Sequence, residues 1–261
     1  MSAGRIDTVR DGWVAVVTIT NESRANSLDD PMLDALVTAL SADALEGARA
    51  VVLTGAGDRN FSGGVDLQAR DGAALTDAVR TGERLLGRVA DAVEDCPVPV
   101  IAALNGNAFG GALEIAMAAD WRLATRGARL GMPPARLGWV YAAPGIRRFV
   151  RVIGAPATRE LFLTARPIDA EAARRIGLVN RVVDRLELRA LAMADARAIA
   201  ANGPMAVAGM RSIIRAIEDD PDPARAEAVA DEWRDRAFAS DDIAEGLGAF
   251  REKRDPDFRG A

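Results

Sequence analysis

Two segments of the chain share one plan: an apolar run rich in β-branched residues, a polar turn, a glycine doublet and then a helical pattern. These segments are VVLTGAGDRNFSGGVDL (51–67) and VIAALNGNAFGGALEIAM (100–117). The apolar runs predict buried strands, and the glycines mark the turns at which helices begin. Together with strands predicted at 13–20 and 121–125, this alternation predicts an α/β fold built on parallel strands.

The other elements follow from helical periodicity and cap residues. One helix is predicted from the capping acid Asp29, with Pro31 in its first turn, to about Ala44, and another over 75–94. After about residue 144 the pattern is mainly helical, over 145–153, 156–163, 169–176, 186–201, 204–217, 223–238 and 241–252, with a short strand at 178–183. The Asn202-Gly203-Pro204 break then divides a predicted α/β core, residues 1–202, from a helical subdomain, residues 203–261.

The chain contains no histidine, and this limits its chemistry. Ser-His-Asp triads, Cys-His pairs and nearly every usual zinc site are excluded, so no metal is expected. Any proton transfer must use Asp, Glu, Lys, Tyr or water. Neither glycine loop matches the P-loop or the dinucleotide fingerprint, which argues against ATP and NAD.

Charge and cysteine content indicate where such a chain works. The net charge is −5 and no basic block stands out, so nucleic acid is not expected as a partner. The lone Cys96 excludes an internal disulfide, and its simplest interpretation is a small buried residue. The polar N-terminus and the lack of a long apolar run predict neither a signal peptide nor a membrane span. A cytoplasmic location is expected.

Glu114 lies three residues after Gly111, inside an apolar run. An acid in this place is either on a solvated helix face or a buried carboxyl whose pKa is raised towards neutrality. Free N–H groups at a helix start favour negative charge, and two directed at one carbonyl oxygen form an oxyanion hole. The layout alone leaves open a second interpretation, two tight turns without a ligand.

Four stretches in order resemble the crotonase (enoyl-CoA hydratase/isomerase) superfamily: FSGGVDL, PVIAALNGNAFGGALEIAMAADWRLAT, LGMPPARLG and ARRIGLVNRVV. The resemblance covers nearly the whole chain. It implies a spiral of ββα units and a C-terminal helical region that mediates homotrimers or dimers of trimers. It also implies an acyl-CoA thioester as substrate, so that coenzyme A is part of the substrate and no separate cofactor is needed.

The resemblance assigns roles to individual positions. The N–H groups of Val65 and Gly111 would hold the thioester oxygen and stabilise an enolate, and Glu114 would be catalytic. Lys253 would reach the CoA phosphates, in one interpretation from a neighbouring subunit, and in another it is only a solvated helix charge. Asp66 would also serve as a cap. The residues expected along the path of CoA and substrate are Arg24, Ala25, Ser62, Gly64, Asp66, Leu67, Gln68, Pro134 and Lys253.

The departures from the family pattern point to the reaction. Hydratases of this superfamily use two glutamates to hold and activate water, and the second would fall at Pro134. Isomerases with one acid at that second position also fit poorly, and the dehalogenase type needs a histidine. Residues 132–145 resemble the methylmalonyl-CoA decarboxylase-like branch instead, with its M-x-P and LG-x-x-Y-x-x-x-G pattern. That branch places Tyr141 beside an acyl carboxylate, although it often has a histidine where this chain has Val65.

These comparisons of pattern predict an acyl-CoA lyase with Glu114 and Tyr141 as catalytic residues. Decarboxylation is favoured slightly, because loss of CO2 leaves an enolate directly and an oxyanion hole does most of the work. The alternatives are a hydratase that uses Glu114 alone and a non-catalytic acyl-CoA-binding or scaffold protein. Tyr141, the only tyrosine, has the alternative of being a core aromatic with a satisfied hydroxyl.

Overall fold

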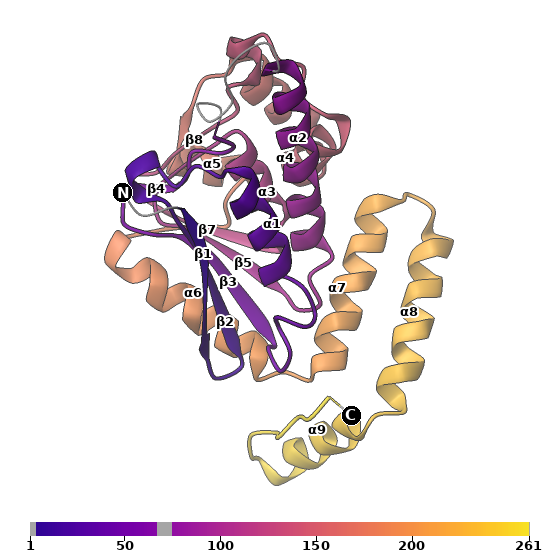
Figure 1. Cartoon of the computed structure of the whole chain (residues 1–261). Helices are drawn as coiled ribbons and strands as arrows, with labels where there is room; N and C mark the ends of the chain where they lie inside the picture. The colour runs from indigo at the N-terminus through magenta and orange to yellow at the C-terminus, as the bar shows by residue number, and fades with distance from the viewer. Residues whose placement is uncertain (1–3, 67–74, 261) are drawn as a thin grey trace.

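The computed structural model describes residues 4–66 and 75–260, and its central feature is a six-stranded sheet (Figure 1). The strand order is β1-β2-β3-β5-β7-β10. The strands are β1 (Arg5–Asp11), β2 (Val14–Thr20), β3 (Ala50–Gly55), β5 (Val100–Leu104), β7 (Trp121–Thr125) and β10 (Arg181–Val183). All neighbours run parallel except β1, which pairs antiparallel with β2 at the edge. The predicted parallel α/β sheet is therefore confirmed, with one antiparallel edge strand added.

A second sheet, of four short strands in the order β4-β6-β8-β9, alternates with the first along the chain. Its strands are β4 (Asn60–Ser62), β6 (Asn107–Phe109), β8 (Arg129–Gly131) and β9 (Ile168–Asp169). Each of β3, β5 and β7 is followed by one of these strands and then by a helix: α2 (Leu75–Glu94), α3 (Gly111–Ala118) or α4 (Ala143–Thr164). This succession is the expected spiral of ββα units.

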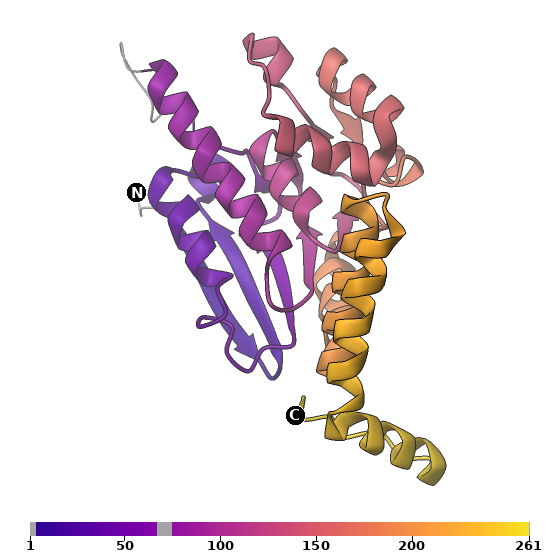
Figure 2. The ribbon, with the colours of Figure 1, turned by 90° about the vertical axis from the view of Figure 1, so that its right-hand side faces the viewer.

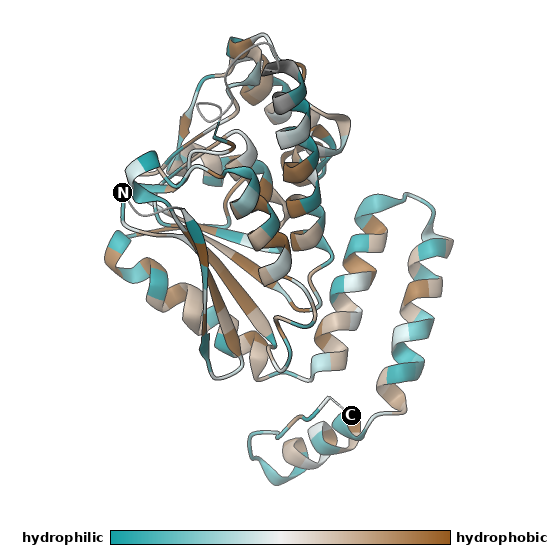
Figure 3. Ribbon diagram, viewed as in Figure 1, coloured by the Kyte–Doolittle hydropathy of each residue, from teal (hydrophilic) through white to brown (hydrophobic). Residues whose placement is uncertain are grey.

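The six-stranded sheet buries both of its faces because alternate strand residues point to opposite sides. Val51 and Leu53 belong to the core beneath α1 (Asp30–Ala39), α2 and α3, whereas Ala50 and Val52 pack towards α6 (Arg185–Ala200). Figure 3 shows the resulting concentration of hydrophobic residues on the strands. Cys96 is buried, as its simplest interpretation required.

Three helices form the C-terminal part of the described chain: α7 (Pro204–Asp219), α8 (Pro223–Phe238) and α9 (Asp241–Glu252). Figures 1 and 2 show α7 and α8 side by side and α9 at the end of the molecule away from α2 and α3. Gly209 permits the close packing of α7 on α8, because a Cβ there would lie 3.1 Å from Trp233 Cβ. Among the described residues, no helix is long and apolar enough to cross a membrane.

Three predicted helices differ in extent from the observed ones. The helix predicted to reach Ala44 ends at Ala39, and the following turns bury Leu45 and close at Gly47, whose φ is +71°. The helices predicted at 145–153 and 156–163 are two halves of α4, joined at a kink where Gly154 has φ +70°. Pro156 lacks the N–H needed to continue the ladder, and the Thr158 hydroxyl donates to the Gly154 carbonyl at 2.8 Å.

Candidate active site

The parallel pairing of β4 with β6 brings the two glycine doublets together. Gly64 has φ +89°, and a Cβ on it would lie 2.7 Å from the Phe109 carbonyl oxygen and 3.3 Å from the Gly111 nitrogen. Glycine is required there for both the backbone conformation and the close approach. Val65, which follows Gly64, is thereby placed beside the first turn of α3.

The N–H groups of Val65 and Gly111 have no acceptor in the part of the chain that the structure describes. The loop around Val65 is fixed on both sides, since Leu28 N–H donates to the Gly64 carbonyl and Asp66 N–H donates to the Leu28 carbonyl, each at 2.8 Å. Within residues 4–66 and 75–260, neither the Val65 nor the Gly111 N–H donates to an acceptor. Gly111 is also the first residue of α3, where the helix dipole favours negative charge.

We predict that Gly64→Ala lowers the free energy of unfolding by about 1–3 kcal/mol, the usual cost of such a backbone conformation. The matched control is Gly63→Ala, because a Cβ there meets its nearest atom, the Ala25 carbonyl oxygen, at an ordinary 3.5 Å. Chemical denaturation of both variants measures the difference. Equal stability of the two variants would contradict this account of the loop.

Glu114 lies in the first turn of α3 and is 3% exposed, so the solvated-face interpretation is wrong. Its Oε1 accepts a hydrogen bond from Arg148 Nη1 at 2.9 Å, and its Oε2 accepts one from the Tyr141 hydroxyl. Burial raises the pKa of Glu114, and the hydrogen bond from Tyr141 and the charge of Arg148 oppose that rise. Both oxygens of this carboxyl are thus occupied by protein donors.

Tyr141 lies between a short 3₁₀ helix, η2 (Pro134–Leu137), and α4, and it is 8% exposed. Its ring packs edge-on against Phe162, with centroids 5.7 Å apart. Burial and the neighbouring Glu114 charge raise the pKa of Tyr141 well above its usual value, so the phenol keeps its proton. Gly145 makes room for the pair, since a Cβ there would lie 2.6 Å from Tyr141 Cε1 and 3.0 Å from Glu114 Oε1.

The segment expected to line the CoA path is held by Asn26, which sequence reasoning missed. This asparagine is buried with φ +55°, and its Nδ2 donates to the Ala56 carbonyl at 2.9 Å and to the Asn60 carbonyl at 2.8 Å. An asparagine that tolerates the left-handed region between two predicted elements was the available signal. It fixes the neighbouring residues Arg24 and Ala25 against the first glycine loop.

Most of the residues predicted for binding gather around this loop. Arg24 Nη1 forms an ion pair with Asp66 Oδ2 at 2.6 Å. The Ala25 carbonyl accepts from Gly63 N–H at 2.9 Å, and Ser62 Oγ accepts from Gly64 N–H at 3.1 Å. Asp66 therefore holds the Arg24 side chain through this ion pair and holds the first glycine loop through its backbone N–H.

The other predicted residues are placed differently. Pro134 is buried at the start of η2, close along the chain to Tyr141. Lys253 caps the exposed end of α9, and Figures 1 and 2 place α9 at the far end of the molecule from α3. Lys253 is therefore not brought together with the glycine loops of its own chain. Leu67 and Gln68 lie outside the described residues.

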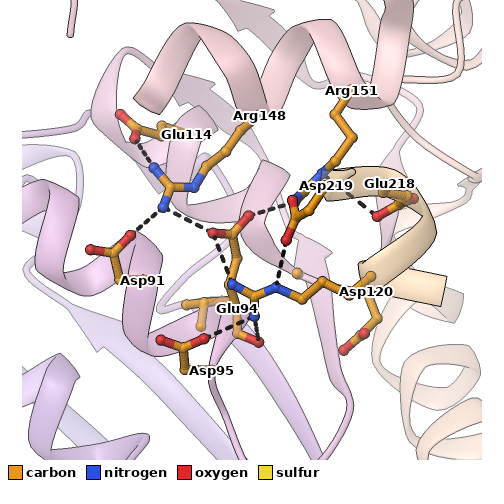
Figure 4. A network of polar contacts seen from close by, with 12 residues as sticks. Asp91, Glu94, Asp95, Glu114, Asp120, Arg148, Arg151, Glu218 and Asp219 are labelled. Carbon is orange, nitrogen blue, oxygen red and sulfur yellow. Dashed lines mark hydrogen bonds and ion pairs between the residues drawn. The ribbon is translucent and has the colours of Figure 1, made fainter. Parts of the chain in front are cut away.

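Two charged residues near the site were not predicted. Arg148, in α4, is buried between Glu114 and the acids of α2, where it contacts Asp91 and Glu94 (Figure 4). Glu83 acts electrostatically on Tyr141 and raises its pKa. Helical spacing was the available signal for Glu83, because it shares one face of α2 with the buried Ala90 and Glu94.

The face of α2 that carries Glu83 is turned towards the site. One turn further along, Leu86 packs on α3, since a Cβ on Gly111 would lie 2.6 Å from Leu86 Cδ2. Glu83 itself is half-buried. In the described part of the chain, no group of three or more Cys, Asp or Glu side chains is placed to hold a metal ion.

Comparison with known proteins adds an independent observation. The model of the family described as "Enoyl-CoA hydratase/isomerase" matches residues 10–261. A short-chain-enoyl-CoA hydratase of Clostridium acetobutylicum is 36% identical over 259 residues, covering 97% of both chains. A carnitinyl-CoA dehydratase of Salmonella enteritidis is 34% identical over 222 residues, covering 81% of this chain and 82% of that protein. The crystal structure of an enoyl-CoA hydratase from Bacillus anthracis superimposes with a TM-score of 0.93 at 33% identity, covering 98% of this chain and 100% of that one.

Proposed function

The chain belongs to the enoyl-CoA hydratase/isomerase family, and we propose that it converts an acyl-CoA thioester through an enolate held by the N–H groups of Val65 and Gly111. Within the described residues neither N–H donates to an acceptor, and Gly64, the neighbour of Val65, lies against the start of α3. Preorganised donors of this kind stabilise the charge that develops on a thioester oxygen. Arg24 and the loop fixed by Asn26 would line the entry of the CoA group.

We propose decarboxylation of a 2-carboxyacyl-CoA as the reaction. The observation that carries this proposal is that Glu114, held by Arg148 and Tyr141, has no second carboxyl as a partner in residues 132–145. A water molecule to be added would therefore lack the pair of carboxylates that hydration requires. Decarboxylation needs no such pair, because the electrons of the breaking C–C bond form the enolate as CO2 leaves.

The second half of the reaction needs one proton at the α-carbon. Glu114 is the suitable acid, because burial raises its pKa towards the pH at which a general acid is effective. Tyr141 and Arg148 orient its carboxyl from two sides. The proton that Glu114 gives to the enolate is replaced from solvent, so the balance is one substrate and one proton to one CO2 and one saturated acyl-CoA.

Product analysis tests this proposal. The purified protein is incubated separately with methylmalonyl-CoA and with crotonyl-CoA, and both are followed by mass spectrometry. We expect loss of CO2 from methylmalonyl-CoA at an enzymatic rate and slow or no hydration of crotonyl-CoA. Fast hydration alone would overturn decarboxylation, and binding of both esters without turnover would favour a scaffold protein.

Hydration is the second candidate, and Glu83 favours it. Its charge acts on Tyr141 from the side of α2, which makes it a candidate to replace the carboxyl missing at position 134. Two relatives are named as a hydratase and a dehydratase. Glu83→Gln separates the candidates, because it should abolish hydration by a Glu83–Glu114 pair and leave decarboxylation unaffected.

We predict that Tyr141→Phe moves the pH dependence of turnover. Glu114 must be protonated to act as an acid, so turnover falls as the pH rises through its pKa. The Tyr141 hydrogen bond lowers that pKa, and its loss should shift the fall to higher pH. Turnover below the fall should drop about tenfold, equivalent to about 1.4 kcal/mol of lost orientation. A profile that is unchanged, or shifted to lower pH, would exclude this role.

We also infer that the C-terminal helices assemble the chain into a homotrimer or a dimer of trimers. Large apolar side chains are exposed on these helices, among them Met210, Ile214, Ile217, Phe238, Leu247 and Phe250. Native mass spectrometry should give the mass of three or six chains, and Phe250→Asp should shift the protein to smaller species. A monomeric wild type would refute the assembly.

A further inference from the structure

Arg148 joins the acid of the site to a second buried carboxylate. Its side chain is 5% exposed, and its Nη1 donates to Glu114 Oε1 while its Nη2 donates to Glu94 Oε2, both at 2.9 Å (Figure 4). Asp91 also accepts from Nη2. One guanidinium therefore connects α3, which carries Glu114, with the last turns of α2.

Glu94 is the last residue of α2 and is itself buried. Besides Arg148, its carboxylate contacts Arg151 of α4 and, at 3.7 Å, Arg215 Nη2 of α7. The Glu94 backbone carbonyl accepts from Arg215 Nη1 at 2.5 Å. The end of α2 is thus tied through one residue both to the candidate active site and to the first C-terminal helix.

Helix α7 also contributes acids to this cluster. Asp219 Oδ1 lies 3.1 Å from Arg151 Nη1, and Asp219 Oδ2 lies 3.6 Å from Arg215 Nε. Glu218 lies 3.6 Å from Arg151. The contacts form a continuous ionic chain from Glu114 through Arg148 and Glu94 to α7.

The charges of this ionic chain are coupled because several of its side chains are shielded from water. The effective dielectric constant is lower there than in solvent, and removing one member of a buried ion pair leaves its partner uncompensated. Arg148 contacts both Glu114 and Glu94, so the negative charge of Glu94 offsets part of the effect of Arg148 on Glu114. The more strongly Glu94 is neutralised by other arginines, the smaller this offset becomes.

We propose that Glu94 and Arg215 are positioning residues that act through Arg148, so that the docking of α7 helps to set the orientation and ionisation of Glu114. This proposal rests on Glu114 being the acid of the proposed function. The charged and titratable groups that shift the pKa of Glu114 are Tyr141, Arg148 and Asp91. Glu94 contacts one of them, Arg148, and Arg215 contacts Glu94. The proposal gives neither residue a contact with the substrate.

The proposal predicts that two substitutions shift the protonation midpoint of Glu114 in opposite directions. Glu94→Gln removes the competing anion, so Arg148 acts fully on Glu114 and the pH at which Glu114 becomes protonated should fall by about one unit. Arg215→Gln removes a cation that neutralises Glu94, so Glu94 draws more on Arg148 and the same midpoint should rise. Simple loosening of the structure would raise or lower both midpoints together.

Infrared spectroscopy measures the protonation midpoint of Glu114 without enzyme turnover. The carbonyl band of protonated Glu114 is identified by its absence in Glu114→Gln and is followed against pH in the free protein. The matched control is Arg88→Gln, which breaks an exposed ion pair between α2 and Asp34 and should leave the midpoint unchanged. Circular dichroism detects variants that do not fold. If Glu94→Gln does not fold, the midpoint of Arg215→Gln tests the proposal, because Arg215 is only partly buried.

Opposite shifts in the two variants would support the proposal, while unchanged midpoints, or shifts in one direction, would overturn it. A separate outcome concerns the proposed function. If Glu114→Gln retains full turnover, the acid role of Glu114 fails, yet the infrared midpoints still report whether α7 influences this carboxyl. The failure of one proposal is therefore distinguishable from the failure of the other.

Discussion

Replacing Gly111 with proline is expected to lower kcat by about 10²–10³-fold, because one of the two proposed oxyanion donors is lost. Gly111 is the first residue of α3, a position at which proline is well tolerated because its N–H has no partner within the helix. The substitution therefore removes a donor while it preserves the helix.

The matched control is Gly111→Ala, which keeps the N–H. Both variants place a Cβ against the end of the Leu86 side chain, at 2.6 Å before adjustment. Steady-state kinetics on the true substrate, with thermal unfolding as a check on folding, should show a large loss for proline and a small one for alanine. Equal losses in the two variants would mean that the N–H of Gly111 does not bind the reacting oxygen.

Glu114→Gln is the second substitution with a large expected effect. Loss of a general acid usually reduces turnover by about 10²–10⁴-fold. Glutamine keeps the size of the side chain and can still accept from Tyr141, so the loss should appear in kcat with little change in KM. The remaining turnover should no longer fall as the pH rises, because the titrating carboxyl is gone.

Kinetics across the pH range in which the protein stays folded measures both effects. Asp34→Asn serves as a control, since it removes an exposed carboxyl in an ion pair with Arg88, on the other side of α2. A Glu114→Gln variant with wild-type kcat, or with an unchanged pH profile, would remove Glu114 from the mechanism.

Long elements were predicted well because their periodicity is strong. The bounds predicted for α2, α8 and α9 agree with the structure, as does strand β7. Strands β4, β6 and β8 were missed because each has three residues, too few for a period of two to be visible. These short strands align the glycine doublets. The proposed oxyanion hole therefore came from the family resemblance and not from periodicity.

The site itself was predicted in part. Gly111 and Glu114 stand in a distinctive motif, but Arg148 lies among several arginines of α4 and gave no sign of being buried. Buried arginines are rare and depend on partners far away in the sequence, here Glu94 and Glu114. Tyr141 was predicted either to face an acyl carboxylate or to be a core aromatic with a satisfied hydroxyl, and its buried ring and its hydrogen bond to Glu114 agree with the second interpretation.

The central claim is that the enolate is protonated inside the site by Glu114, and reaction in D2O tests it most directly. Decarboxylation of methylmalonyl-CoA should give propionyl-CoA with one deuterium at the α-carbon and a single configuration there, because the acid approaches one face. The Glu114→Gln variant should form this product slowly and with less stereochemical preference. A racemic product from the wild type, or hydration of crotonyl-CoA without any release of CO2, would contradict the account.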